Sequence, residues 1–190
     1  MKELKQELDA SLARQLVGSH IMSHFCTIDA ESKLAGSFHD PRYVPFYYYL
    51  GKYIQPKAIA ELGFRIGLFS GAFFKSCDTV EYLLAFQRKT DKYYSPRVGF
   101  KNIKRDYKGP VDFYYGNISD DEFISKLDAR SWDLVLINEE VNYDMHMNYL
   151  DYAWPRVSIN GYIVMDNISS HDPAKRAFDS FCANRKLEPI

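Results

Sequence analysis

Short apolar segments alternate with amphipathic segments along most of this chain. Five segments are almost entirely apolar, which is typical of strands buried on both faces; they are residues 57–62, 79–86, 111–115, 132–137 and 162–165. Between and after them, helical spacing of apolar positions covers residues 67–76, 96–106, 119–127, 141–154 and 172–186. Because strands and helices alternate, we expect a mostly parallel sheet with helices on both faces, a Rossmann-like three-layer α/β/α sandwich.

Local signals predict where several of these elements begin. Ser119-Asp-Asp-Glu122 has the spacing of a capping box and would open a helix. Asn160-Gly161 predicts a turn before the fifth strand. Asp172-Pro173 supplies an N-cap and a proline in the first turn of the last helix.

The beginning of the chain is predicted to be an extension of one larger domain. Residues 1–25 have helical spacing, residues 26–45 are polar and contain Gly and Pro, and 46–54 predict a short aromatic helix. We therefore expect an N-terminal helix and loop over 1–45 and one α/β domain over 46–190. The sequence ends soon after the last predicted helix. We therefore expect one of two cases: the chain is a fragment, or its sheet is shortened and the fifth strand lies near an edge.

Composition narrows the classes of partner and location. The formal net charge of −1 gives no support for binding nucleic acid or an anionic membrane. No apolar run approaches the length of about 20 residues that spans a bilayer, and the first residues are charged rather than apolar, so we do not expect secretion. The three cysteines show no metal-ligand spacing. We expect a cytoplasmic protein. The sequence leaves open whether the protein forms a homodimer.

The most informative segment follows the first predicted strand. Ala58 to Leu62 is followed by glycines at 63 and 67 and then by helical spacing, an arrangement that lets backbone N–H groups approach a nucleotide-like ligand. The segment matches the dinucleotide-binding motif G-x-G-x-x-G only in part, because Arg65 occupies the position of the middle glycine.

Each predicted strand ends in a polar group. The five ends carry Glu61, Gln87, Asn117, Asn138 and Asp166. Ligands of open α/β sheets bind outside the carboxyl ends of the strands, which favours one shared site. Ordinary turn chemistry is the alternative explanation for any single strand end.

The order of these motifs resembles the class I S-adenosylmethionine-dependent methyltransferases. The closest likeness is to the small O-methyltransferase-like group, whose first motif reads E-x-G-x-x-x-G-x-S. Glu61-Leu-Gly63-Phe-Arg-Ile-Gly67 fits this motif, with Ser70 one residue late. The segments 132–138 and 161–167 are similar to the fourth and fifth strands of that group.

The resemblance implies S-adenosylmethionine (SAM) as cofactor and a small-molecule acceptor methylated on oxygen. It carries a cofactor-binding role onto Glu61, Gly63, Phe64, Gly67, Ser70, Gln87, Asn117, Ile118 and Asn138. Glu61 would indirectly hold the ammonium group of the cofactor, and Gln87 would meet the ribose hydroxyls. Asn117 would read the adenine edge while Ile118 packs on its face. Asn138 and Asp166 are the expected catalytic residues, beside the transferred methyl group and the acceptor.

Three positions depart from the pattern of that group. Gln87, Asn117 and Asn138 stand where its members usually have a carboxylate. A hard divalent cation prefers charged oxygens, so we expect no catalytic metal. The alternative function is therefore a methyltransferase-like module that has lost catalysis and binds a partner. A nicotinamide-dependent oxidoreductase is a weaker option, since strand two lacks the required acid.

His146 is a further candidate in the helix after strand four. It could act as a general base toward an acceptor hydroxyl. A histidine on the exposed surface of the helix is the plainer interpretation.

Overall fold

The computed structural model describes residues 43–65, 67–89, 99–101, 103–104, 107–139, 141–168 and 171–189. The predicted helix over 1–25 and most of the predicted loop over 26–45 lie outside these residues. Helix α3 (Tyr43–Ile54) begins inside the span predicted as loop. Of the helix predicted over 96–106, residues 99–101 and 103–104 are described and are helical.

The described chain forms two compact units whose segments alternate along the sequence. One unit contains α3 and α4 (Leu68–Ser76), and the other contains the whole sheet with helices α6, α7 and α8. The predicted division between residues 45 and 46 stays a prediction. No helix in the described part of the chain has both the length and the apolar character needed to cross a bilayer.

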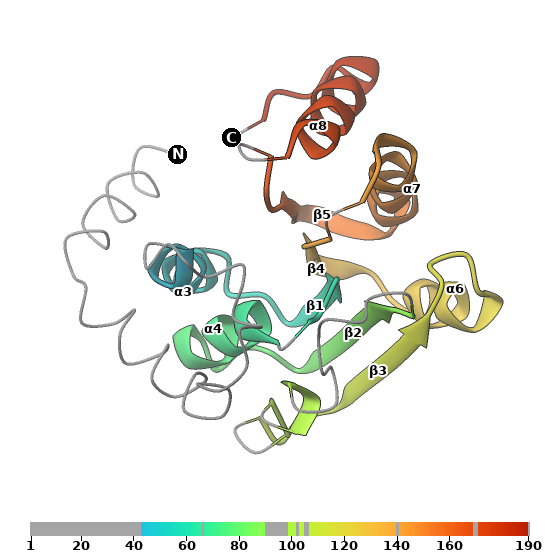
Figure 1. Ribbon diagram of the computed structural model, residues 1–190. Coiled ribbons are helices and arrows are strands. Elements are labelled where there is room, and N and C mark those ends of the chain that lie inside the picture. Colours follow the sequence, from blue (N-terminus) through green and yellow to red (C-terminus); the bar gives the residue numbers. More distant parts are fainter. Residues whose placement is uncertain are drawn as a thin grey trace, which may run out of the picture. The chain divides into compact units, whose positions relative to one another are not determined.

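The sheet has five parallel strands (Figure 1). They are β1 (Ala58–Leu62), β2 (Tyr82–Arg88), β3 (Val111–Gly116), β4 (Trp132–Ile137) and β5 (Val157–Met165). Their order is β3-β2-β1-β4-β5, so β1 lies at the centre and the crossovers run outward from it in both directions. This arrangement confirms the predicted Rossmann-like α/β fold with a parallel sheet, and it places β5 at an edge of the described sheet.

One face of the sheet packs against α6 (Asp121–Asp128), α7 (Tyr143–Ala153) and α8 (Asp172–Arg185). The strand residues on this face include Ala60, Leu62, Leu84, Phe86, Val135 and Ile137. The helices contribute large side chains, among them Phe123, Tyr149 and Phe181. Because side chains alternate along a strand, the intervening residues of β1, β2 and β4 point to the opposite face.

The starts of two helices differ from the sequence prediction. The N-cap of α6 is Asp120 rather than Ser119, and the Asp120 side chain makes no capping bond. The predicted capping box is therefore wrong, because this carboxylate bonds to groups that precede the helix. The N-cap of α8 is His171, and Asp172 is the first helical residue.

Strand β5 begins earlier than predicted, at Val157. Trp132 pairs with Val157 while Leu134 pairs with Tyr162, so the extra residues of β5 form an irregularity in the pairing. Asn160 has a φ of 66° within it. The turn predicted at Asn160-Gly161 therefore lies within β5 rather than before it.

Helices α3 and α4 pack closely within their own unit. A Cβ atom on Gly51 would lie 2.0 Å from Ser76 Oγ, which explains a glycine in the middle of α3. Tyr47 packs on Phe69 with ring centroids 4.0 Å apart.

Candidate functional site

Four residues lie in one row across the carboxyl edge of the sheet, just beyond the last residue of β1. The pairing of β2, β1, β4 and β5 gives this row as Gln87, Gly63, Asn138 and Asp166. The N–H groups of Gly63, Asn138 and Asp166 each donate to a carbonyl of the neighbouring strand, at 3.0, 2.7 and 2.9 Å. Main-chain bonds therefore fix the row, and three of the sequence-predicted site residues are brought together with Gly63.

The polar side chains of this region are removed from water. Glu61 and Gln87 have no exposed surface, and Asn138 and Asp166 are 3% and 8% exposed. Glu61 and Gln87 alternate with the helix-facing Leu62 and Phe86, so they point to the opposite face of the sheet. Buried polar groups of this kind are expensive unless they are hydrogen-bonded.

Gly63 is required by the close approach of β4. Its φ is 96°, and a Cβ atom would lie 2.2 Å from the carbonyl oxygen of Asn138 and 2.8 Å from Cγ of Glu139. Only glycine fits this conformation and this separation. The first glycine of the motif is thus explained by the packing of the turn on the end of β4.

Asn138 presents an open acceptor at the centre of the row. Its Nδ2 donates to the carbonyl of Gly63 at 3.4 Å. Its Oδ1 is buried and accepts no hydrogen bond from the described residues. A buried acceptor without a donor costs about 1–3 kcal/mol, so a ligand group that donates to Oδ1 would be favoured.

The rest of the glycine motif belongs to the unit of α3 and α4. Gly67 is the N-cap of α4 with a φ of 74°, and a Cβ atom there would lie 2.6 Å from the Phe64 ring. Arg65 has a φ of 50°, the left-handed conformation that favours glycine. The position of the missing middle glycine therefore has a glycine-like backbone. Phe64, Arg65 and Ser70 are buried.

The end of β3 carries a carboxylate that the sequence analysis did not single out. Asp120 Oδ2 accepts from the backbone N–H of Asn117 at 2.8 Å and from the Tyr114 hydroxyl at 2.7 Å. These bonds, with that of the Asn117 backbone first, hold the pKa of Asp120 below its usual range. Asn117 is exposed, whereas Ile118 is buried in the core under α6. The Asn-x-x-Asp spacing of residues 117–120 was the available signal, but Asp120 was considered only as an inner residue of the predicted Ser119–Glu122 capping box.

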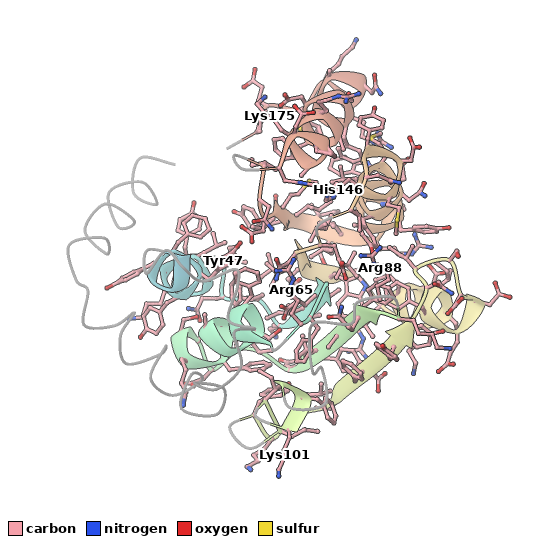
Figure 2. All side chains as sticks on the ribbon, viewed as in Figure 1. Tyr47, Arg65, Arg88, Lys101, His146 and Lys175 are labelled. Carbon is pink, nitrogen blue, oxygen red and sulfur yellow. The ribbon has the colours of Figure 1, made fainter. Side chains whose placement is uncertain are left out.

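His146 lies on the side of α7 that packs toward the start of α8 (Figure 2). It is fully buried, so the plainer interpretation of an exposed histidine is wrong. Neither ring nitrogen bonds to a described residue. Burial, and secondarily the nearby His171, lowers its pKa to about 4, which keeps the imidazole neutral.

The described residues contain no group of three or more His, Cys, Asp or Glu side chains that could hold a metal ion.

Comparison with known proteins identifies the fold through structures rather than sequences. No protein-family model matches the sequence, and comparison with curated proteins finds no match. Among solved structures, the methyltransferase PaMTH1 of Podospora anserina bound to S-adenosylhomocysteine (SAH) is 17% identical, with a TM-score of 0.65 over 89% of this chain and 79% of that chain. The O-methyltransferase of Bacillus cereus in complex with SAH is 16% identical, with a TM-score of 0.67 over 90% and 80% of the two chains.

A third solved structure extends this likeness. The O-methyltransferase TomG of Streptomyces achromogenes, involved in tomaymycin synthesis and bound to SAM, is 13% identical, with a TM-score of 0.64 over 95% and 86% of the two chains. The protein therefore has the fold of these methyltransferases. The resemblance inferred from the sequence is confirmed at the level of the fold.

Proposed function

We propose that the protein is a SAM-dependent methyltransferase that transfers a methyl group to a hydroxyl of a small-molecule acceptor. The row of Gln87, Gly63, Asn138 and Asp166 at the carboxyl edge of the sheet carries this proposal. In open α/β sheets this edge is where ligands bind. The solved methyltransferases of the same fold that hold SAM or SAH support the choice of cofactor.

The residues of the row fit such a cofactor. Asn138 Oδ1 is a buried acceptor that could receive a hydrogen bond from the ammonium group of the amino-acid end. Gln87 offers an amide to the ribose hydroxyls, although without the added strength of a charged acceptor. Asp120 would supply a carboxylate close to Asn117, at the position expected for the adenine amino group. The roles of Glu61, Phe64, Gly67, Ser70 and Ile118 stay predictions.

The proposed reaction depends mainly on alignment. Bound SAM supplies an electrophilic methyl group on its sulfonium. Asp166, next to Asn138 in the row, would accept the proton of the acceptor hydroxyl as the oxygen–carbon bond forms. Asn138 would hold the amino-acid end, so that the methyl group points toward the acceptor side. Positioning of this kind is a large part of catalysis in two-substrate reactions.

A second candidate function is a non-catalytic binding module of the same fold. The observation that favours it is that Gln87 and Asn138 are neutral and almost completely buried. A buried amide of this kind can stabilise the folded protein without taking part in cofactor binding or catalysis.

Calorimetric titration with SAM and SAH tests the proposal. Saturable heat with both ligands is expected, together with a rise of the melting temperature. Absence of heat and of a thermal shift with either ligand contradicts it. The variant Gln87→Asp with Asn138→Asp separates the two candidates, because affinity that is present only in the double variant favours the non-catalytic module.

A further inference from the structure

An ion pair between a partly exposed arginine and a buried glutamate spans the carboxyl end of the central strand. Arg88 Nη2 lies 3.7 Å from Glu139 Oε2, and the two side chains are 25% and 2% exposed. Arg88 is the last residue of β2, and Glu139 follows the end of β4. Because β1 lies between these two strands, the pair links the neighbours of β1 at the level where β1 ends. Figure 2 shows Arg88 at this end of β2.

The ion pair is in contact with the glycine turn. The position that a Cβ atom on Gly63 would take is 2.8 Å from Cγ of Glu139. The methylene stem of Glu139 thus packs directly on the Gly63 backbone, while its carboxylate is held by Arg88. The orientation of the Glu139 side chain therefore limits where the turn can lie.

Tyr149 of α7 lies near the same carboxylate. Its phenol is buried and its hydroxyl bonds to no described residue. Burial first, and then the charge of Glu139, raise its pKa, whereas the charge of Arg88 lowers it. The carboxylate side of the pair is therefore removed from water while Arg88 is partly exposed, so a Glu139 carboxylate without a cation near it would be unfavourable.

We propose that Arg88 and Glu139 are positioning residues. They fix the Gly63 turn in the position that is required for binding the amino-acid end of the cofactor. This inference rests on the proposed methyltransferase function. Without the attraction of Arg88, the Glu139 carboxylate would turn toward water and withdraw its stem from Gly63. The turn would then lose the support that keeps its main chain against Asn138.

The test compares two ligands that differ at one end. SAH contains the amino-acid end, whereas 5′-methylthioadenosine has the same adenosine part without it. Glu139→Gln keeps the stem and removes the charge, and Arg88→Met removes the partner. We expect each variant to weaken SAH binding roughly tenfold while 5′-methylthioadenosine binding changes less than about twofold, because the turn packs on Asn138, the proposed acceptor for the ammonium group of the amino-acid end.

A double variant covers the case in which the single variants do not fold. Arg88→Met with Glu139→Gln removes both charges of this pair, so its stability should recover, while the side chain at position 139 is still not held by position 88 and the selective loss of SAH affinity persists. Arg156→Met is the matched control. It breaks the Arg156–Asp128 ion pair, which joins the η2 turn (Trp154–Arg156) to α6, and should leave the affinity ratio of the two ligands unchanged.

The outcomes are distinguishable. If the wild-type protein binds neither ligand, the proposed function fails and the positioning role fails with it. If the wild-type protein binds both ligands and the variants weaken both equally, or weaken neither, only the positioning role is overturned. A selective loss of SAH affinity in the Arg88 and Glu139 variants, absent from Arg156→Met, supports it.

Discussion

The carbonyl oxygen of Asn138 lies 2.2 Å from the position that a Cβ atom on Gly63 would occupy. This contact joins the turn after β1 to the end of β4 so closely that no side chain fits between them. A residue of the glycine motif is therefore fixed by the protein's own main chain, and the same contact brings Asn138 to the centre of the candidate site.

Replacing Gly63 with alanine should destabilise the protein and abolish cofactor binding. The clash with Asn138 and the φ of 96° together should cost about 3 kcal/mol of unfolding free energy. Urea unfolding measures this loss, and titration with SAH measures the binding. Ser125→Ala, at an exposed position of α6, is the control and should change stability by less than about 0.5 kcal/mol. An unchanged stability of Gly63→Ala would contradict the described turn.

Replacing Asn138 with aspartate should create a dependence on divalent cations. The new carboxylate would be buried next to Glu139 and in the same row as Asp166, so like charges would lower the stability at neutral pH by about 2–4 kcal/mol. Mg²⁺ should restore the melting temperature of the variant, and EDTA should reverse this effect. Asn184→Asp, at an exposed position of α8, should respond to neither addition. A variant whose melting temperature does not respond to Mg²⁺ would show that the new carboxylate does not complete a cation site at this row.

His146 should make the protein less stable in mild acid. The pKa of His146 is about 4 in the folded protein, against about 6.5 in an unfolded chain. Between these values the unfolded chain binds a proton that the folded protein does not bind. The stability should therefore be complete above pH 6.5, fall as the pH decreases toward 4, and lose about 3 kcal/mol in total.

The variant His146→Phe checks this assignment. It removes the titrating group, and because neither ring nitrogen bonds to a described residue, its stability at pH 7.5 should stay within about 1 kcal/mol of the wild-type value. The difference between wild-type and variant unfolding free energies, measured from pH 7.5 to 4, isolates His146. Parallel pH profiles for the two proteins would show that His146 is not the titrating group.

Asp120 should contribute to recognition of the adenine ring if the proposed function is correct. Its carboxylate bonds to the Asn117 backbone and to Tyr114, and so orders the end of β3. Asp120→Ala should weaken SAH binding by about tenfold. It should also reduce the ratio between the affinity for SAH and the affinity for the analogue in which inosine replaces adenosine. Asp121→Ala, the exposed neighbour, is the control. Equal affinities of Asp120→Ala and the wild-type protein would exclude this role.

Asp133 should stabilise the beginning of the central strand. Its Oδ2 accepts from the backbone N–H groups of Lys57 and Ala58, at 2.8 and 3.0 Å. Removing the acceptor in Asp133→Ala leaves the N–H groups of Lys57, just before β1, and of Ala58, its first residue, without this partner, which should cost about 2 kcal/mol in urea unfolding. Asp133→Asn keeps an uncharged acceptor and should lose less. A larger loss in Asp133→Asn than in Asp133→Ala would contradict this explanation.

Apolar periodicity determined the elements of the fold because doubly buried parallel strands have little freedom in composition. The segment 132–137 was predicted with the bounds that β4 has, and the alternation of strands with helices was enough to predict the parallel sheet. Element ends were less well predicted. The second strand extends to Arg88 rather than Phe86, since its polar last residues Gln87 and Arg88 are paired with β3 and Gln87 is buried.

The sequence by itself thus determined the fold class and the polar character of the strand ends, because both follow from spacing along the chain. Only the tertiary structure decided which of these ends share a row, since strand order and register depend on pairings between distant segments. It also decided that Gly63 is required by Asn138, that Asp120 supports Asn117 rather than a helix, and that Arg88 meets Glu139 across β1. Such contacts join residues far apart in sequence or at irregular turns, where periodicity carries no information.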